Sequence, residues 1–487
     1  AKMPVDLGAL LSVEGLGPKG VKNLWAALRI CTLADLETAA RAGKIRDVPG
    51  FGEKAEQKLL RGIGFVAAAS GRLPIGRAQP LAIVIEARLR EVPGVREVAI
   101  AGSLRRRRET IGDFDFLVVA DDPARVMDAF VSFPDVVTVH GKGATKSSVR
   151  LAIGVDADLR VLPRESFGAA MQYFTGSKDH GVACRKIAIE KGLKLNEYGV
   201  FRGETRIAGE TEEEVYAALG LPWIPPEIRE DRGEIAAALA NRLPKLVEYG
   251  SIRGDLQTQT SWTDGADSIE EMALAARELG REYIAITDHT KSLAMTGGSD
   301  EAKLARQGEE IDRVRERVKG IRILKSAEVD ILRDGSLDIG DEALAELDVV
   351  GVAVHSHFNL PRAEQTRRIC RAIRNPHAHI LFHPTGRILG KRDAYDVDME
   401  EVIRVAAQTG TVLEIDAFPD RLDLNEEHAR KAVEAGAKLV IDTDAHATAH
   451  LALVDYGVAV ARRAWVEAGS VINTLPVEGF LAALKPR

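Results

Sequence analysis

The sequence predicts a multidomain protein in which an α+β front half is followed by an α/β back half. Its 487 residues suggest about three domains, because one hydrophobic core usually serves about 150 residues. The front half contains two glycine-rich helix starts and, after them, two strand patterns that carry acidic residues. The back half alternates short apolar strands with helices, and this alternation predicts a parallel barrel.

The composition is that of a globular protein, with 45% hydrophobic and 29% charged residues and no low-complexity tract. Three cysteines, Cys31, Cys184 and Cys370, lie far apart without a CxxC pair. The sequence therefore indicates neither a disulfide framework nor a thiolate metal site, and we expect a reducing cytoplasm. The lack of an apolar run of about 18 residues argues against a membrane partner.

The net charge of −7 conceals a difference between the two ends of the chain. Residues 1–200 contain 30 Lys and Arg against 23 Asp and Glu, whereas residues 251–487 contain 30 against 40. A basic front half favours a polyanionic partner, and an acidic back half rich in His and Asp favours divalent cations. Charge alone fits equally well with surfaces that simply differ from domain to domain.

Two segments near the start resemble each other: VEGLGPKGVKNLWAALRI at residues 13–30 and VPGFGEKAEQKLLRGI at residues 48–63. In each, two glycines allow a tight turn that brings the N–H groups of a helix N-terminus close to an anion. One such start is usually an ordinary helix start, but two in tandem indicate helix-hairpin-helix motifs, which grip the DNA backbone without reading bases. The expected DNA-binding residues here are Gly15, Gly17, Lys19, Gly50, Gly52 and Lys54.

A helical pattern over residues 78–92 and the strand REVAIAG lead to the stretch GDFDF, which places Asp113 and Asp115 two residues apart. Residues so spaced on a strand project from one face, and a divalent cation relieves the repulsion between their carboxylates. Asp158, on the later strand DADLRVL, could complete a two-metal site. A DxD pair alone fits a solvated strand edge, so the neighbouring residues decide the interpretation.

Those neighbours are the residues of GSLRR, shortly before Asp113. Gly102 and Ser103 offer a small turn, and the guanidinium groups of Arg105 and Arg106 suit a triphosphate. Together with the acids they favour a catalytic site in which two cations, Mg²⁺ or Mn²⁺, support in-line attack of a hydroxyl on a phosphate. This chemistry needs no covalent intermediate, and the front half shows no convincing nucleophile with an adjacent base.

A polar, helix-prone stretch at residues 231–250 marks a domain boundary, after which the repeating units begin. The apolar strands that end in or carry Asp, Glu or His are YIAITDH, IRILKSAEVD, DVVGVAVHSH, HILFHP, TVLEIDAF and KLVIDTDAH. Polar residues at strand C-termini build the sites of parallel barrels, and imidazole with carboxylate suits zinc, manganese or iron. A single histidine on an apolar strand is more often a satisfied core residue, which is our interpretation of His357, His377, His379 and His428.

The stretches AGSLRRRRETIGDFDFLV, MQYFTGSKDH and RKIAIEKGLKLNEYGVF resemble the bacterial family X DNA polymerases, and the back half resembles the PHP domain that these enzymes carry. The resemblance covers essentially the whole chain. It implies a helix-hairpin-helix domain at residues 1–76, a nucleotidyltransferase palm at 77–165, a thumb at 166–230, a linker at 231–250 and a distorted (β/α)7 PHP barrel at 251–487.

By this resemblance, Asp113, Asp115 and Asp158 would hold the two cations of nucleotidyl transfer. The expected partners are primed or gapped DNA and deoxynucleoside triphosphates, and the protein is expected to be a monomer. Residues implied to contact the nucleotide are Gly102, Ser103, Arg106, Gly112, Tyr173, Phe174, Gly176 and Lys178. Tyr173, Phe174 and Gly176 would shape the sugar pocket. Arg185 would face the template.

The PHP resemblance implies three divalent cations at the C-terminal face of the barrel. The residues that match its ligand positions are Asp264, His289, Glu328, His355, His383, Asp444 and His446. Two positions differ, because RGDLQTQTSWTDG has Gln257 and Gln259 where relatives commonly have histidines. A neutral amide is a weaker ligand than imidazole for a borderline metal, so we expect fewer than three ions, Mn²⁺ or Zn²⁺.

The expected function is gap-filling DNA synthesis in repair, including base excision repair, with a Mn²⁺-dependent 3′–5′ exonuclease in the barrel. Three alternatives stay open: a polymerase whose barrel is only structural, a scaffold that binds DNA ends, and a small-molecule phosphoesterase. The intact acids of the front half argue against the scaffold. The tandem DNA-binding motifs argue against the phosphoesterase.

Overall fold

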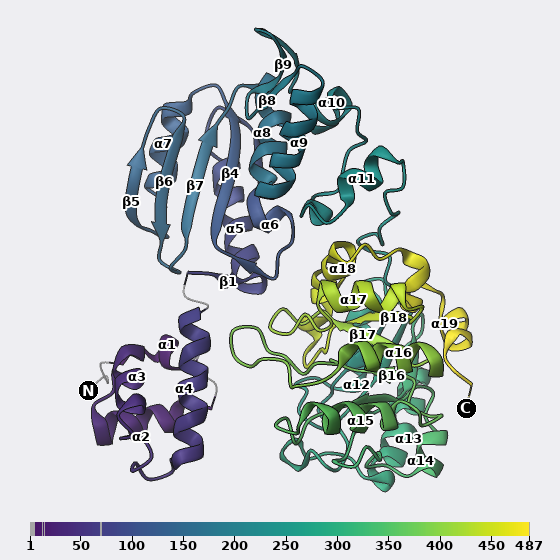
Figure 1. Ribbon diagram of the computed structural model, residues 1–487. Coiled ribbons are helices and arrows are strands. Elements are labelled where there is room, and N and C mark those ends of the chain that lie inside the picture. Colours follow the sequence, from purple (N-terminus) through teal and green to yellow (C-terminus); the bar gives the residue numbers. More distant parts are fainter. Residues whose placement is uncertain (1–4, 12, 14, 69–70, 487) are drawn as a thin grey trace.

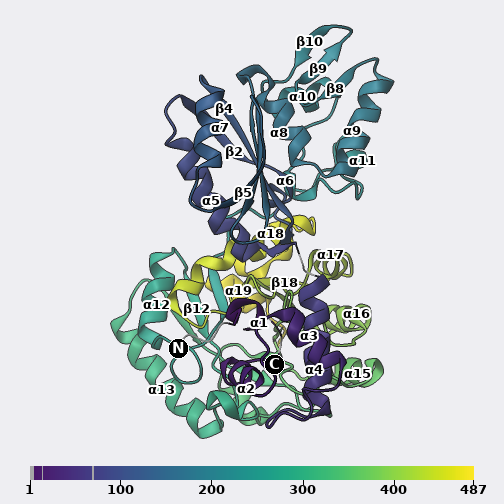
Figure 2. The ribbon, with the colours of Figure 1, turned by 90° about the vertical axis from the view of Figure 1, so that its left-hand side faces the viewer.

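The computed structural model describes residues 5–11, 13, 15–68 and 71–486. A small helical domain, a mixed sheet with its helices, a smaller α+β part and a parallel α/β domain follow one another along the chain (Figures 1 and 2). Within the described ranges, no helix combines the length and the apolar character needed to cross a membrane.

The helical domain packs four helices around a small core that includes Leu24, Leu36 and Leu59. Pro18 pre-sets the first turn of the second helix, and Thr32 forms a capping box with Asp35 at the start of the third. Both predicted glycine turns immediately precede helices, α2 and α4. The helices are α1 (Leu7–Leu11), α2 (Pro18–Leu28), α3 (Leu33–Arg41) and α4 (Glu53–Ala68).

The second part, which we call the palm, is built on a five-stranded sheet in the order β2-β4-β7-β6-β5. Only β4 and β7 run parallel in it. Helices α5 and α7 pack on the sheet face that carries Phe114 and Phe116. The palm elements are β1 (Leu73–Pro74), α5 (Ile75–Arg90), β2 (Val95–Ile100), α6 (Gly102–Arg105), β3 (Thr110–Ile111), β4 (Asp113–Ala120), α7 (Pro123–Val131), β5 (Val136–Lys142), β6 (Lys146–Leu151) and β7 (Asp156–Val161).

The palm begins earlier than the expected boundary at residue 77. Strand β1 pairs with β3, and α5 starts at Ile75. Both elements therefore belong to the palm, because their side chains enter its core. A local helical pattern fixes the middle of a helix better than its first turn.

The third part, the thumb, surrounds a core that includes Cys184, Val200 and Tyr216. Its elements are α8 (Phe167–Thr175), α9 (Lys178–Glu190), β8 (Lys194–Asn196), β9 (Gly199–Arg202), β10 (Thr205–Ala208), α10 (Glu212–Ala218) and α11 (Glu234–Leu239). Helix α11 lies inside the expected linker, yet Glu234 is buried and contacts His180 Nδ1 at 2.7 Å. Residues 231–250 are therefore a packed extension of the thumb rather than a free connector.

The fourth part alternates strands and helices, as predicted. All its strand pairs are parallel, in the orders β11-β12-β13 and β14-β15-β16-β17-β18. Parallel bridges from Thr258 to Ala445 and from His289 to Glu328 connect the two sheets. Its elements are β11 (Gly254–Thr258), α12 (Ile269–Glu278), β12 (Tyr283–Ile286), α13 (Glu301–Arg317), β13 (Arg322–Lys325), β14 (Glu328–Asp330), α14 (Asp341–Ala345), β15 (Gly351–Ala353), α15 (Arg362–Ala372), β16 (Ile380–Leu381), α16 (Met399–Thr409), β17 (Val412–Asp416), α17 (Glu426–Glu434), β18 (Leu439–Asp442), α18 (Val454–Arg463) and α19 (Val477–Ala483).

The palm rests on the loops of this fourth part. Arg387 forms an ion pair with Glu109 of the palm at 2.5 Å. Pro419 approaches Gly76 of α5 so closely that a Cβ on Gly76 would lie 2.3 Å from Pro419 Cβ. Glycine at position 76 is thus required by this contact between the two domains.

Candidate active sites

Asp113, Asp115 and Asp158 meet on one face of the palm sheet. The parallel register of β4 and β7 places Asp115 beside Asp158. Asp113 and Asp115 share the face opposite the one covered by α5 and α7, because side chains alternate along a strand. The predicted acids are therefore brought together at the start of two adjacent strands.

The electrostatics of these acids suit a divalent cation. Burial, together with the charges of Asp113 and Asp158, raises the pKa of Asp115 to about 7. Burial would also raise the pKa of Asp158, but hydrogen bonds from Lys146 and Ser148 outweigh it and lower that pKa. Lys146 Nζ lies 2.8 Å from Asp158 Oδ2, and Ser148 Oγ donates to Oδ1 at 2.6 Å. Three oxygen donors that repel one another fit Mg²⁺ or Mn²⁺.

Gly102 lies directly beside these carboxylates, and Ser103 follows it in α6. Gly102 adopts a φ of +63°, and a Cβ there would lie 2.4 Å from Asp115 Oδ2. Ser103 Oγ is buried and makes no hydrogen bond to any residue that the structure describes. A buried hydroxyl without a partner is rare, so this atom is available for a ligand next to the acids.

The predicted arginines are engaged by the thumb. Arg106 donates from Nη1 to the carbonyl oxygen of Thr175 at 2.5 Å, and its Nε donates to Glu230 at 3.0 Å. Arg105 forms a bidentate pair with Glu212, with N···O distances of 2.9 and 2.6 Å. Both arginines therefore connect the palm to the thumb region, Arg105 through Glu212 and Arg106 through Thr175 and Glu230.

The thumb side of this region contains the predicted aromatic pair. Tyr173 and Phe174 stack edge to face with ring centroids 5.0 Å apart. The Arg185 guanidinium lies 5.8 Å from the Tyr173 ring centroid. Lys178 is exposed at the first turn of α9. These side chains leave an aromatic surface flanked by positive charge.

Two predicted glycines make close approaches. Gly176 has a φ of +71°, and a Cβ there would lie 3.0 Å from Arg106 Nη1. A Cβ on Gly112 would lie 2.9 Å from Arg72 Nη1. A side chain at either position would have to displace an arginine, Arg106 or Arg72 respectively.

The predicted DNA-backbone contacts lie at the helix starts of the first domain. Gly15 and Gly50 adopt φ values of +86° and +91°, and Gly17 is the N-cap of α2. Lys19 and Lys54 are exposed in the first turns of their helices. Gly52 immediately precedes α4. Two helix N-termini without capping side chains therefore carry a lysine each.

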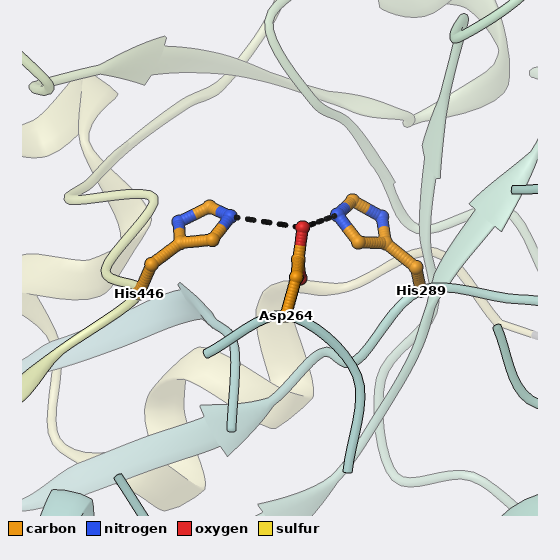
Figure 3. Close-up of side chains that lie close together, drawn as sticks. All are labelled: Asp264, His289 and His446. Carbon is orange, nitrogen blue, oxygen red and sulfur yellow. Dashed lines mark ion pairs between the residues drawn. The ribbon is translucent and has the colours of Figure 1, made fainter. Parts of the chain in front are cut away.

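In the fourth part, Asp264 lies between two imidazoles (Figure 3). Its Oδ2 atom is 3.6 Å from His289 Nε2 and 3.8 Å from His446 Nε2. One ligand atom of each residue lies within 4.8 Å of the others, the spacing of a metal-binding set. The three residues come from loops after β11, β12 and β18. We call this set the Asp264 cluster.

Glu328 organises a second set of histidines. Its Oε1 atom lies 2.7 Å from His383 Nε2 and 3.1 Å from His355 Nε2, and its Oε2 atom lies 3.3 Å from His289 Nδ1. Burial would raise the pKa of Glu328, but the charges of His289 and His355 outweigh it and lower that pKa well below its usual range. Burial would lower the pKa of His355, but Glu328 and Asp330 raise it to about 10. We call this set the Glu328 cluster.

The donor sets fit divalent cations. The Nδ1 atoms of His289 and His383 are buried and make no hydrogen bond within the described residues. His355 Nδ1 contacts Asp330 at 3.0 Å, the outer-shell carboxylate contact that orients a metal-binding imidazole. His383 and Asp444 have φ values of +27° and +48°, a strained backbone of the kind that gathers at functional sites.

All seven predicted ligands line one cavity of about 430 Å³. Two residues that sequence reasoning did not anticipate also shape this region. Arg421 lines the cavity beside Asp444, and Glu414 is buried against Gln257. The acid-bearing strand TVLEIDAF marked this part of the chain, but nothing in the sequence singled out an arginine in the loop after it. His379 is a core residue as interpreted, because its Nδ1 accepts from Val350 N at 3.0 Å.

Gly102→Ala is expected to damage the palm site by pushing the new Cβ against Asp115 and straining the backbone. We expect the free energy of unfolding to fall by about 1–3 kcal/mol and nucleotide insertion to fall by more than the stability loss explains. The matched control is Gly154→Ala, since Gly154 also has a positive φ, +91°, but has nothing within 4 Å of the added atom. Thermal unfolding and single-nucleotide insertion kinetics on both variants give the comparison. Equal effects on insertion would contradict the role of Gly102.

The metal-free protein is expected to lose stability relative to Asp115→Asn as the pH rises from about 4 to about 7. The pKa of Asp115 is higher in the folded than in the unfolded state, so the unfolded chain releases this proton at lower pH. The free energy of the unfolded state therefore falls relative to that of the folded state as the pH rises. The difference should reach about 2–4 kcal/mol and should shrink when Mg²⁺ is added. Chemical denaturation at several pH values in chelator measures it. A pH-independent difference would contradict the buried repulsion.

Comparisons with known proteins cover the whole chain. Residues 7–64 match the SAM-like helix-hairpin-helix tandem family, and residues 170–230 match the DNA polymerase beta thumb family. The chain is 40% identical over 491 residues to the DNA polymerase/3′-5′ exonuclease PolX of Bacillus subtilis strain 168, an alignment that covers 99% of this chain and 85% of that protein. It is 31% identical over 231 residues to a probable phosphatase of Thermoanaerobacter sp. strain X514, covering 45% of this chain and 89% of the phosphatase. A Leishmania infantum polymerase beta in a ternary P/T complex is 22% identical, covers 46% of this chain and 97% of its own, and has a TM-score of 0.30.

Proposed function

The chain belongs to the bacterial family X DNA polymerases that carry a C-terminal PHP domain, and from this premise we propose that it fills gaps in DNA and trims 3′ ends with its barrel. The polymerase proposal rests above all on the meeting of Asp113, Asp115 and Asp158 beside Gly102. The substrates are primed or gapped DNA and deoxynucleoside triphosphates, and the setting is DNA repair in the cytoplasm, base excision repair included. The active protein is a monomer.

In the palm, the 3′ oxygen of the primer attacks the α-phosphorus, and the bond to the pyrophosphate breaks with its electron pair leaving on that group. Asp113, Asp115 and Asp158 would hold the cations that activate the attacking oxygen and neutralise the pyrophosphate. Ser103 Oγ binds a phosphate oxygen of the incoming nucleotide. Arg106 moves from Glu230 toward the triphosphate, which couples nucleotide binding to the position of the thumb.

Other residues position the substrates. Tyr173, Phe174 and Gly176 border the sugar, Gly112 and Lys178 flank the nucleotide, and Arg185 faces the template. The tandem helix starts of the first domain hold the phosphate backbone through their N–H groups and lysines. Such contacts fix the DNA end without selecting a sequence.

The fourth part is a PHP barrel of the distorted (β/α)7 type, with β13 and β14 counted as one bent strand. The Asp264 and Glu328 clusters would each hold a cation, Mn²⁺ or Zn²⁺, and two such ions supply an activated water for phosphodiester hydrolysis. His289 lies between the two clusters and contacts both acids. The water oxygen would attack the phosphorus of the last phosphodiester while the P–O3′ bond breaks. The freed 3′ oxygen of the shortened strand takes up the proton that the water loses, and the terminal nucleotide is released as a 5′-monophosphate.

The direct test measures both activities on one gapped substrate. With deoxynucleoside triphosphates and Mg²⁺ we expect extension across the gap. With Mn²⁺ and no nucleotides we expect shortening of the 3′-end. Extension without shortening in either metal would mean that Gln257 and Gln259 ended the barrel's chemistry and left a structural domain. No extension would refute the polymerase proposal.

A further inference from the structure

Arg421 brings a positive charge into the barrel cavity, among residues otherwise suited to hold cations. Its Nε lies 3.3 Å from Asp444 Oδ2 and 3.4 Å from Asp416 Oδ2. The side chain is 22% exposed and faces the same cavity as the Asp264 and Glu328 clusters. The guanidinium therefore compensates two carboxylates and at the same time borders the space for a substrate.

The two carboxylates need this compensation. Asp416 is fully buried, and its Oδ2 atom makes no hydrogen bond to the residues that the structure describes. Asp444, a predicted metal ligand, is 5% exposed; its carboxylate lies outside both clusters, with its Oδ1 atom 3.8 Å from His446 Nδ1. A buried carboxylate without a cation or a hydrogen-bond donor is strongly unfavourable. The guanidinium of Arg421 supplies, next to Asp416 and Asp444, the positive charge that a divalent ion would otherwise provide.

The two glutamines act as hydrogen-bond donors to other acids of the barrel. Gln259 Nε2 donates to Glu328 Oε2 at 2.8 Å. When the side-chain amide of Gln257 is oriented with its nitrogen toward Glu414, that nitrogen donates to Glu414 Oε1 at 2.6 Å. An amide nitrogen binds no cation, so the nitrogens of the two glutamines add no metal ligand where histidines would. At Asp416 and Asp444, therefore, the positive charge beside the carboxylates is the guanidinium of Arg421.

The loop that carries Arg421 is held from several sides. Thr385 N donates to Asp423 Oδ2 at 2.9 Å, and Arg387 donates to the carbonyl oxygen of Leu422. Pro419 packs against Gly76 of the palm. A guanidinium on a fixed loop can meet a phosphate with little loss of conformational freedom.

We propose that the Arg421 guanidinium takes the place of one cation of the barrel, neutralising Asp416 and Asp444 and binding the terminal phosphate of a DNA 3′ end. The inference rests on the proposed nuclease and deepens it, because it names the group that holds the substrate phosphate beside two ions. In this role Arg421 binds the substrate, and its positive charge remains in the cavity when the metal ions dissociate.

The first test counts ions in the full-length protein. Zn²⁺-loaded protein is freed of loose metal and analysed by mass spectrometry, in the Asp115→Asn background that weakens the palm site. We expect two ions per chain in this background and also with Arg421→Met added. The triple variant Gln257→His, Gln259→His, Arg421→Met should gain a third ion. The double variant Gln257→His, Gln259→His, which keeps Arg421, should not. A third ion already bound when Arg421, Gln257 and Gln259 are all intact would overturn the proposal.

The second test measures phosphate binding by calorimetry on Mn²⁺-loaded protein, with thymidine 5′-monophosphate, the product of cleavage, as the probe. We expect Arg421→Met to weaken binding about 10- to 100-fold, the usual effect of losing a charged hydrogen-bond donor, and Arg421→Lys to weaken it less. All proteins in this second test have the wild-type palm, so differences between them report on the barrel. Unchanged affinity in Arg421→Met would refute the phosphate contact. If both tests give the expected results but the wild-type protein cuts no DNA, the role of Arg421 stands and only the proposed nuclease activity is refuted.

Discussion

Asp115→Asn is expected to reduce nucleotide insertion by at least about 10³-fold while leaving the barrel's 3′ cleavage intact. Asp115 is the central acid, because it shares a strand face with Asp113 and lies beside Asp158 in the parallel register. The neutral amide keeps the shape but removes the charge that binds cations where negative charge develops in the transition state. Single-turnover insertion on a one-nucleotide gap measures the effect.

The matched control lies on the same sheet. Asp156 is the register partner of Asp113 on β7, but its side chain is 46% exposed and pairs with His140 and Arg150. Asp156→Asn should therefore change insertion less than about twofold. Comparable losses in Asp115→Asn and Asp156→Asn would show that general disturbance of the sheet, and not cation binding, explains the defect.

The palm shows what a local pattern can reveal. The spacing of Asp113 and Asp115 on a strand is enough to predict that they share a face. The parallel pairing that brings Asp158 to them joins residues 43 positions apart. The sequence suggested Asp158 as a third acid on a later strand, but it did not show that the two strands pair. Lys146, which pairs with Asp158, could not be predicted, because it comes from a neighbouring antiparallel strand whose register the sequence leaves open.

The arginines show a different limit. A guanidinium close to a phosphate motif suggests a triphosphate contact, but Arg106 lies against Glu230, which is 124 residues away. Whether an arginine binds substrate or another domain depends on packing between domains, and local sequence does not contain that information. The boundary at residue 77 failed for a related reason, since β1 belongs to the palm only through its pairing with β3.

In the barrel, strand ends were predictable and loop interiors were not. All of the apolar strands that end in or carry a polar residue, except TVLEIDAF, contribute a ligand position, because parallel strands bring their carboxyl ends to one face. The seven predicted ligands accordingly meet at a single cavity. Arg421 lies five residues beyond β17, and its inward direction follows from contacts to Asp423 and Leu422 made by a distant loop. Those contacts join residues far apart in the chain, so the local sequence could not predict that Arg421 points into the cavity.

Glu328→Gln is expected to reduce 3′ cleavage by at least about 100-fold and to lower the metal content of the barrel, while insertion by the palm stays unchanged. Glu328 is fully buried, and its two oxygens face three imidazoles, His289, His355 and His383. Removing its charge takes away a ligand of the Glu328 cluster. The loss also reaches the Asp264 cluster, because His289 contacts both acids.

The control for this change is Glu282→Gln. Glu282 precedes β12 at the opposite end of the strand from His289, and its side chain is 42% exposed against Arg253. Its loss should leave both cleavage and metal content near wild type, since an exposed ion pair contributes about 0–1 kcal/mol. Cleavage in Glu328→Gln at the wild-type rate would place the hydrolytic site elsewhere in the chain. A loss of cleavage with metal content intact would instead make Glu328 a proton carrier, because the ions would then be held by the histidines and Asp264 alone.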